Sequence, residues 1–205
     1  MCYQLEGSVP CCSGPGPLHW EAVKRVFRYL IGTKSHALTF GSEQRGLEGY
    51  ADANDGSSQE HQHAISGYAY LMDGGAISWI SRKQEVIALS TTEAEYIATT
   101  HGAKEAIWFQ KLLGELFPGP SKTFTLSCDN QSTINLATTD NYHARTKHID
   151  VRYHFIRELI TNGTIQLKYC PTNSMVADIL AKPVPVWKVP ILAHDLGLHN
   201  VCKGV

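Results

Sequence analysis

The stretch LSTTEAEYIA, Leu89–Ala98, marks the point at which short strand-like segments give way to a long helix. Its tetrapeptide Ser90-Thr91-Thr92-Glu93 fits the capping box S/T-x-x-E. In that motif the Ser90 side chain accepts from the backbone N–H of Glu93, and the Glu93 carboxylate reaches back to the N–H of Ser90. The sequence predicts a helix over 91–116, which the Pro-Gly-Pro at 118–120 closes.

Upstream of this helix, three segments are rich in β-branched or aromatic residues and bounded by Gly or Asp, which predicts short β-strands. They are LEGYADA, SGYAYLM and AISWISR, and the last two flank Asp73-Gly74-Gly75, which predicts a hairpin turn. The preceding HALTFG also indicates a short strand, which is set aside as a lead-in to the meander. Before it, HWEAVKRVFRYLIGT has the apolar spacing of an amphipathic helix that stops at Gly32. These signals predict an antiparallel meander.

Downstream, strands alternate with helices. The expected order is the strand FTLSC, a short helix after Asp129, a helix over about 148–161, the strand TIQLKYC and a last short helix VADILA, with Pro183 and Pro185 ending the pattern. A meander followed by βα units predicts an α/β fold with a mixed sheet and helices on its faces.

Composition favours an ordinary globular protein. Of 205 residues 43% are hydrophobic and 18% are charged, and the formal net charge is −1, so no global basic field indicates a nucleic-acid partner. No apolar run approaches the length of a membrane span, and the N-terminus does not resemble a signal peptide, so we expect an intracellular protein without a membrane partner. No cysteines form a C-x-x-C pair, and Cys128 and Cys170 fit reduced core thiols.

The two glutamates of the opening stretch have different explanations. Glu93 is accounted for by the capping box, whereas Glu95 is turned about 200° away from it on the helix. Glu95 shares its stripe with Thr99, Gly102 and Ala106, whose small side chains would let this face lie close against another layer. An acid on such a face is costly unless something pairs with it. Taken alone, Glu95 is better explained as a residue at the solvent edge of the helix.

Three further acids stand at the ends of apolar runs. Asp52 ends the strand LEGYAD, Asp129 follows the strand FTLSC, and Asp178 opens the last helix. Any one of them could be a cap or turn residue. Together with Glu95 they form a set of four carboxylates that, once brought together, would repel one another unless cations neutralised them. Such a set fits two hard ions, Mg²⁺ or Mn²⁺, of the kind that act in pairs on phosphodiesters.

Six motifs carry a resemblance to a known family. YADA, GAISWISRKQEVIALSTTEAEYIA, KEAIW, CDNQSTINLA, HARTKHIDVRYHFIREL and ADILAKP together resemble the ribonuclease H region of copia-type LTR-retrotransposon Pol polyproteins. The likeness runs from about residue 47 to 183, and HWEAVKRVFRYLIGT resembles the end of the preceding reverse-transcriptase region. The domain boundaries expected are an unstructured 1–17, a reverse-transcriptase remnant 18–46, a ribonuclease H-like domain 47–183 and a C-terminal tail 184–205.

This resemblance implies the ribonuclease H-like fold, a mixed five-stranded sheet with helices on both faces. It implies cleavage of the RNA strand in an RNA–DNA hybrid by two Mg²⁺ or Mn²⁺ ions, and an association with a reverse-transcriptase polymerase region. The family's catalytic, metal-binding acids fall on Asp52, Glu95, Asp129 and Asp178. Many cellular ribonucleases H carry a histidine before the last aspartate, and the corresponding loop CPTNSMVA has none, which leaves the proton-transfer role unassigned.

A basic segment lies between His143 and Arg157. It contains four Arg or Lys residues and the single acid Asp150, a local charge of +3 with neutral histidines. Phosphate contact by Arg145, Lys147 and Arg152 is the functional interpretation, and a solvated helix face is the structural one. The histidines at 143, 148 and 154 could also indicate a metal site, although no Cys or carboxylate spacing supports it.

Three functions are therefore compared. The first is an active ribonuclease H, and the second is a folded, catalytically silent remnant that only binds nucleic acid or a polymerase partner. The third is an integrase or transposase core, whose acid set ends with a helical glutamate. Here the last acid is Asp178 and the helical glutamate comes second, which favours a ribonuclease H.

Overall fold

The computed structural model describes residues 16–41, 46–54, 63–117, 119, 123–139 and 150–201. Its helices are α2 (Pro17–Gly32), α3 (Thr91–Leu116), α4 (Gln131–Thr138), α5 (Asp150–Thr161), the 3₁₀ turn η3 (Thr172–Ser174), α6 (Asp178–Ala181) and α7 (Val189–Asp195). Its strands are β1 (His36–Leu38), β2 (Glu48–Ala53), β3 (Ile65–Met72), β4 (Gly75–Lys83), β5 (Phe124–Cys128), β6 (Ile165–Tyr169) and β7 (Leu198–Asn200).

The central sheet has five strands in the order β4-β3-β2-β5-β6. The meander β2-β3-β4 is antiparallel, whereas β5 and β6 join it in parallel. Asp73 and Gly74 connect β3 to β4 with φ values of 51° and 84°, the backbone that tight hairpin turns require. The predicted hairpin, the predicted helix α3 and the predicted mixed five-stranded sheet are all confirmed.

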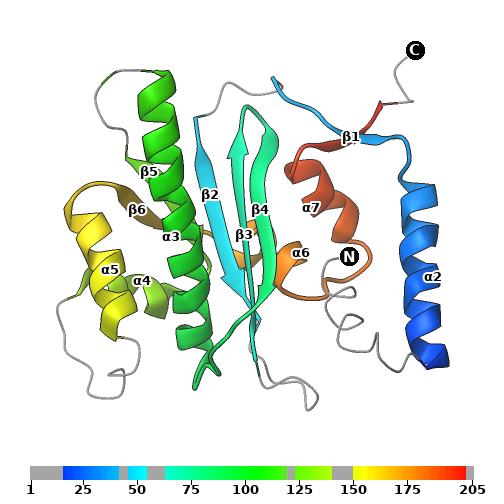
Figure 1. The fold of residues 1–205 in the computed structure, drawn as a ribbon, viewed down its shortest axis with the longest axis horizontal. Helices are drawn as coiled ribbons and strands as arrows, with labels where there is room; N and C mark the ends of the chain where they lie inside the picture. The colour runs from blue at the N-terminus through cyan, green and yellow to red at the C-terminus, as the bar shows by residue number, and fades with distance from the viewer. Residues whose placement is uncertain are drawn as a thin grey trace.

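Strand β3 shows why helices cover both faces of this sheet (Figure 1). Successive side chains of a strand point to opposite faces. Tyr68 and Tyr70 accordingly enter one core cluster with Phe109 of α3, and Ala69 and Leu71 enter another with Leu180 of α6 and Leu196, which follows α7. The hydrophobic core is thus divided into two layers by the sheet.

Small residues let α3 lie close against the sheet, as its sequence predicted. Thr99, Gly102 and Ala106 are all buried. A Cβ atom on Gly102 would come 3.2 Å from Cδ1 of Leu126 on β5, and the Tyr70 hydroxyl donates to the Gly102 carbonyl over 2.7 Å. This close approach carries the residues of the α3 face, Glu95 among them, onto the sheet.

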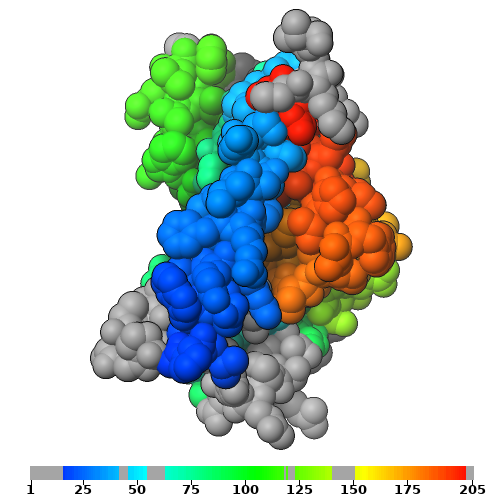
Figure 2. Space-filling model, turned by 90° about the vertical axis from the view of Figure 1, so that its right-hand side faces the viewer, coloured from blue at the N-terminus to red at the C-terminus, as the bar shows by residue number. Residues whose placement is uncertain are grey.

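The two ends of the described chain meet in a second, smaller sheet. β1 pairs antiparallel with β7, with His36 opposite Asn200, although these strands lie more than 150 residues apart in the sequence. Figure 2 shows the result, with α2 and β1 in blue beside the C-terminal segment in orange. Strand β1 is the beginning of HALTFG, which the sequence indicated as a short strand, whereas α7 and β7 were not expected. A strand of three residues carries too little periodicity to be recognised, and long-range pairing is what stabilises it.

Helix α2 differs from the other long helices because none of its residues is buried. Four apolar residues of α2 are each more than half exposed, namely Leu18, Trp20, Phe27 and Ile31.

No described helix is long and apolar enough to cross a membrane.

Candidate active site

Four carboxylates meet at one edge of the central sheet. Asp52 lies near the carboxyl end of β2 and Asp129 follows the last residue of β5. Because β2 and β5 are parallel neighbours, these two ends reach the same edge. Glu95 comes from the first turns of α3, and Asp178 is the first residue of α6.

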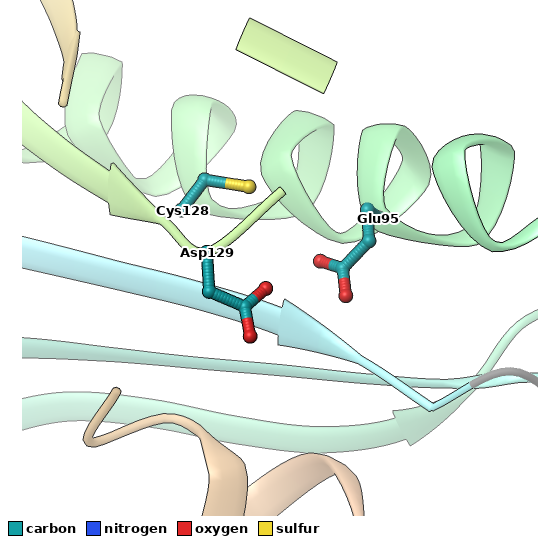
Figure 3. A group of neighbouring side chains, drawn as sticks. All are labelled: Glu95, Cys128 and Asp129. Atoms are coloured by element: carbon teal, nitrogen blue, oxygen red, sulfur yellow. The ribbon is translucent and has the colours of Figure 1, made fainter. Parts of the chain in front are cut away.

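The carboxylates are close enough to share cations. One oxygen from each of Asp52, Asp129 and Asp178 lies within 4.8 Å of the other two, and the same limit joins ligand atoms of Glu95, Cys128 and Asp129. Asp129 belongs to both groups. Figure 3 shows the second group, with Glu95 extending from α3 and Asp129 from the end of β5 toward the same space.

The start of α3 separates the two glutamates as the capping argument predicted, with one correction. Ser90 Oγ accepts from the Glu93 backbone N–H over 3.2 Å. The Glu93 carboxylate, however, accepts from the N–H of Leu89 over 2.8 Å rather than from that of Ser90. Glu93 is therefore engaged in capping, while Glu95 enters the acidic cluster.

Glu95 lies in the interior and not at the solvent edge. Its side chain is 7% exposed and Asp52 is fully buried. Burial, followed by the negative charges of Asp52 and Asp129, raises the pKa of Glu95 to about 9. Burial also raises the pKa of Asp52 to about 7, against the lowering effect of the Lys182 ammonium. The cluster concentrates negative charge where water cannot stabilise it.

Three buried oxygens of this cluster lack a hydrogen-bond donor among the described residues, namely Oδ2 of Asp52, Oε2 of Glu95 and Oδ1 of Asp178. Of these, Asp178 Oδ1 has an ion-pair contact with the Lys182 ammonium at 2.9 Å. Buried acceptors without donors are costly, and an oxygen-preferring cation satisfies several of them at once. Cys128 fits such an ion poorly, because burial and the charge of Glu95 raise the pKa of its thiol to about 12 and keep it neutral. The donor set therefore fits a hard divalent metal.

Two lysines that sequence reasoning missed complete the site. Lys182 Nζ lies 3.2 Å from Oδ1 of Asp52 and 2.9 Å from Oδ1 of Asp178. Lys188 Nζ lies 2.5 Å from Oδ2 of Asp178 and donates over 2.8 Å to the carbonyl of Thr172. The Thr172 hydroxyl in turn donates to Asp129 Oδ2 over 2.9 Å. The i,i+4 spacing of Asp178 and Lys182 was a readable signal, whereas nothing local marks Lys188.

The proposed nucleic-acid residues are only partly described. Arg145 and Lys147 lie outside the described residues, as do His143 and His148. Arg152 lies at a cavity of about 340 Å³, which we call the basic cleft. Its other lining cations are Arg82 and Lys83 of β4 and Lys104 of α3, with His101, Glu85 and Glu105 beside them.

Two other residues of the basic segment, Arg157 and His154, lie in different surroundings. Arg157 donates through Nη2 to the carbonyl of Leu136 over 3.1 Å and to the carbonyl of Thr139, so it ties α5 to the end of α4. His154 is exposed on α5. Neither metal-competent group within the described part of the chain contains a histidine.

Comparison with known proteins identifies the relatives of this chain. It is 45% identical over 186 residues to the retrovirus-related Pol polyprotein from transposon TNT 1-94 of Nicotiana tabacum, covering 91% of this chain and 14% of that polyprotein. It is 35% identical over 191 residues to the corresponding polyprotein from transposon RE2 of Arabidopsis thaliana, covering 91% of this chain and 13% of the relative. The chain thus spans about a seventh of the length of these relatives. No family model matches it.

The fold has a structural counterpart. The solved structure of LC11-RNase H1, isolated from compost, superimposes with a TM-score of 0.50 and 13% sequence identity, covering 66% of this chain and 91% of that one. The similarity concerns the fold, and the relationship to transposon proteins rests on the sequence identities above. The chain belongs to the retrovirus-related Pol polyproteins of copia-type transposons, and the part of Pol that it represents has the ribonuclease H fold.

Proposed function

We propose that this chain is a metal-dependent endonuclease that cleaves the RNA strand of RNA–DNA hybrids. The observation that carries the proposal is the convergence of Asp52, Glu95, Asp129 and Asp178, with buried oxygens of Asp52 and Glu95 that no described residue satisfies. A cluster of this kind is destabilising unless it has a cationic ligand, so a binding function explains why the fold retains it.

The two overlapping groups of ligands suggest how the ions are held. Asp52, Asp129 and Asp178 form one set, and Glu95 shares Asp129 with it. Two Mg²⁺ or Mn²⁺ ions bound in this way would stabilise the attacking and leaving oxygens of a phosphodiester. Asp129 belongs to both sets, and the Thr172 hydroxyl donates to one of its oxygens. We therefore propose catalytic, metal-holding roles for all four acids.

The hybrid would be held mainly through its phosphates. Arg152 lies with Arg82, Lys83 and Lys104 at the basic cleft, four cations facing the acids Glu85 and Glu105. We propose that Arg152 binds backbone phosphate there, and that Arg145 and Lys147, which lie outside the described residues, also contact phosphates. Phosphate contacts give affinity without sequence preference, and backbone shape together with the RNA 2′-OH distinguishes a hybrid from duplex DNA.

The polymerase region of the same polyprotein is the proposed protein partner. Trp20, Phe27 and Ile31 of α2 are 60%, 57% and 70% exposed. An apolar helix face of this kind is typical of an interaction surface. This chain spans 14% of the tobacco polyprotein, and we propose that preceding Pol sequence covers the α2 face.

A catalytically silent binding remnant is the second candidate. The observation that favours it is the pair Lys182 and Lys188, which already neutralises part of the acidic cluster. The two candidates differ in one measurable property, because only the first releases shorter RNA products from a hybrid.

The deciding experiment incubates the purified chain with an RNA–DNA hybrid labelled at the RNA end. Cleavage that requires Mg²⁺ or Mn²⁺ and disappears in Asp129→Asn supports the nuclease. The amide is nearly isosteric and keeps an oxygen for Thr172, so the fold should persist, as circular dichroism can verify. Binding of the hybrid by the wild-type protein without any cleavage would instead establish the silent remnant.

A further inference from the structure

Asp178 is unusual among the four acids because each of its oxygens faces a different lysine. Lys182 approaches Oδ1 at 2.9 Å and Lys188 approaches Oδ2 at 2.5 Å. The Asp178 side chain is 2% exposed, so neither ion pair is a solvent-screened surface contact. If Asp178 is to ligate a divalent ion, that ion has to enter a site that already contains two positive charges.

The two lysines are held differently. Lys188 has a side chain only 9% exposed and is anchored a second time by the Thr172 carbonyl at 2.8 Å. Lys182 has a side chain 31% exposed, and its ion pairs among the described residues are with two carboxylates of the site, Asp52 and Asp178. The side chain of Lys188 is therefore held in place, whereas the ammonium of Lys182 can move away from the two carboxylates.

Lys182 lies where a cation bridging Asp52 and Asp178 would lie. Its ammonium joins Oδ1 of one carboxylate to Oδ1 of the other, and these two residues belong to the same metal-competent group. A divalent ion bound to the same oxygens would stand a few ångströms from the ammonium, where repulsion in a buried site is strong.

The structure also provides room for Lys182 to move. Lys182 lines a cavity of about 460 Å³ between α2, β4 and α6, whose walls are mainly apolar, including Tyr29, Trp79 and Ile179. The aliphatic stem of a lysine packs readily along such a wall while its ammonium reaches water. Leaving the carboxylates therefore does not require the backbone of α6 to move.

We propose that Lys182 is the resident cation of the acidic site. It holds Asp52 and Asp178 together in the metal-free protein and gives way when a divalent ion binds, while Lys188 stays and orients Asp178. The inference rests on the proposed metal-dependent function and adds to it a competition between a side chain and the metal. Metal affinity is thereby set partly by Lys182, and the metal-free fold is protected from the repulsion of its own acids.

The test measures Mg²⁺ binding by calorimetry and by its effect on the melting temperature, without nucleic acid. Lys182→Met removes the competing charge, so it should bind Mg²⁺ about tenfold more tightly than the wild type or better, because a unit charge a few ångströms away contributes at least that much. In EDTA the same variant should melt at a lower temperature, since Asp52 and Asp178 lose their partner. Saturating Mg²⁺ should remove this deficit.

Three matched variants separate competition from general damage. Lys182→Arg keeps the charge and should keep an affinity close to that of the wild type. Lys188→Met removes a charge from the same carboxylate but also an anchor, so its melting temperature should stay low at saturating Mg²⁺. Lys168→Met changes an exposed lysine of β6 and should change neither quantity. If Lys182→Met does not fold in EDTA, Lys182→Gln retains a hydrogen-bond donor without the charge and takes its place.

The outcomes distinguish this inference from the proposed function. If the wild type binds Mg²⁺ and Lys182→Met binds it no more tightly, or keeps its deficit at saturation, the competition is disproved and the metal site stands. If Lys182→Met binds Mg²⁺ and the wild type does not, the competition is supported in its strongest form. If neither binds, both the competition and the metal-dependent nuclease are overturned.

Discussion

The acidic site and the basic cleft are both charged regions beside α3, and they differ in what holds their charges. At the acidic site the carboxylates are buried and repel one another, as the raised pKa of Glu95 records. In the basic cleft, Arg82 is more than half exposed and pairs with the neighbouring Glu85. Buried like charges cost folding free energy, whereas exposed ones cost almost none. The cost of the acidic site to folding therefore indicates that it has a function. The charges of the basic cleft cost little, so they are compatible with a function but do not indicate one.

The largest expected effect concerns Glu95. Glu95→Gln should reduce metal-dependent cleavage about 100-fold or more, the usual scale for losing one group that stabilises transition-state charge. The same change should raise the free energy of unfolding in EDTA, because it removes a buried negative charge that Asp52 and Asp129 repel. Glu93→Gln is the matched control, since glutamine can still accept from the Leu89 N–H, and it should retain most activity. Comparable losses of activity in both variants would remove the distinction between cap and ligand.

A backbone contact should produce the next largest effect. Gly67 of β3 is paired with Asp52, and a Cβ atom there would come 2.9 Å from the backbone nitrogen of Ala181 in α6. Gly67→Ala must push α6, and with it Asp178, away from the sheet. We expect a loss of about 1–3 kcal/mol in the free energy of unfolding, the usual cost of overpacking, together with weaker Mg²⁺ binding.

Gly114→Ala is the control for this substitution. Gly114 is exposed on α3 and has no atom within 4 Å of an added Cβ. Alanine should therefore stabilise the helix by about 1 kcal/mol, and chemical denaturation measures both variants. An unchanged Mg²⁺ affinity in a destabilised Gly67→Ala protein would show that α6 does not position Asp178.

The residues of the acidic site could be predicted from the sequence far better than those of the basic cleft. Strand ends and helix starts are local features, so the positions of Asp52, Asp129 and Glu95 on their elements followed from periodicity and caps. The parallel pairing of β2 with β5 then brought two of these ends together. Lys188 could not be predicted in this way, because it reaches Asp178 from a segment in which prolines had suggested only a tail.

The basic cleft depends on tertiary packing and not on any local motif. Arg82, Lys104 and Arg152 come from β4, α3 and α5, and only the contact between α3 and α5 brings them to one cavity. Within the basic segment the sequence also gave no means of separating Arg152 from Arg157. The latter is a structural residue that donates to two backbone carbonyls.

This difference between two arginines of one helix provides the third prediction. Arg152→Ala should weaken binding of every hybrid sequence alike, and it should lower the slope of log affinity against log salt concentration by about one unit, as expected for one lost phosphate contact. Arg157→Ala should instead lower the melting temperature and leave the salt slope unchanged. Affinities are measured at several salt concentrations with Asp129→Asn as the background to prevent cleavage. A slope that depends on Arg157 and not on Arg152 would place the phosphate contact elsewhere.

The smallest expected effect is a shift in the protonation of His101, which lies at the basic cleft. Burial lowers the pKa of His101 below the ordinary value of 6.5, and the charges of Lys104, Arg82 and Arg152 lower it further, against Glu85. Lys83 and Glu105 also line this cavity. As the pH falls through 6.5, the unfolded chain binds a proton that the folded protein does not bind. The free energy of unfolding should therefore decrease from pH 6.5 down to the folded pKa, and His101→Gln should reduce that slope.

Hybrid binding should reverse part of this shift if phosphates enter the basic cleft. A phosphate between Arg82, Lys104 and Arg152 would offset the three positive charges that disfavour the imidazolium, so the pKa of His101 should rise toward its ordinary value. The measurement is an NMR titration of the His101 ring with and without a bound hybrid, again in Asp129→Asn. A pKa of His101 that is unaffected by hybrid would mean that the cleft does not bind the backbone, and the comparison between the two charged regions would then reduce to one functional site and one solvated surface.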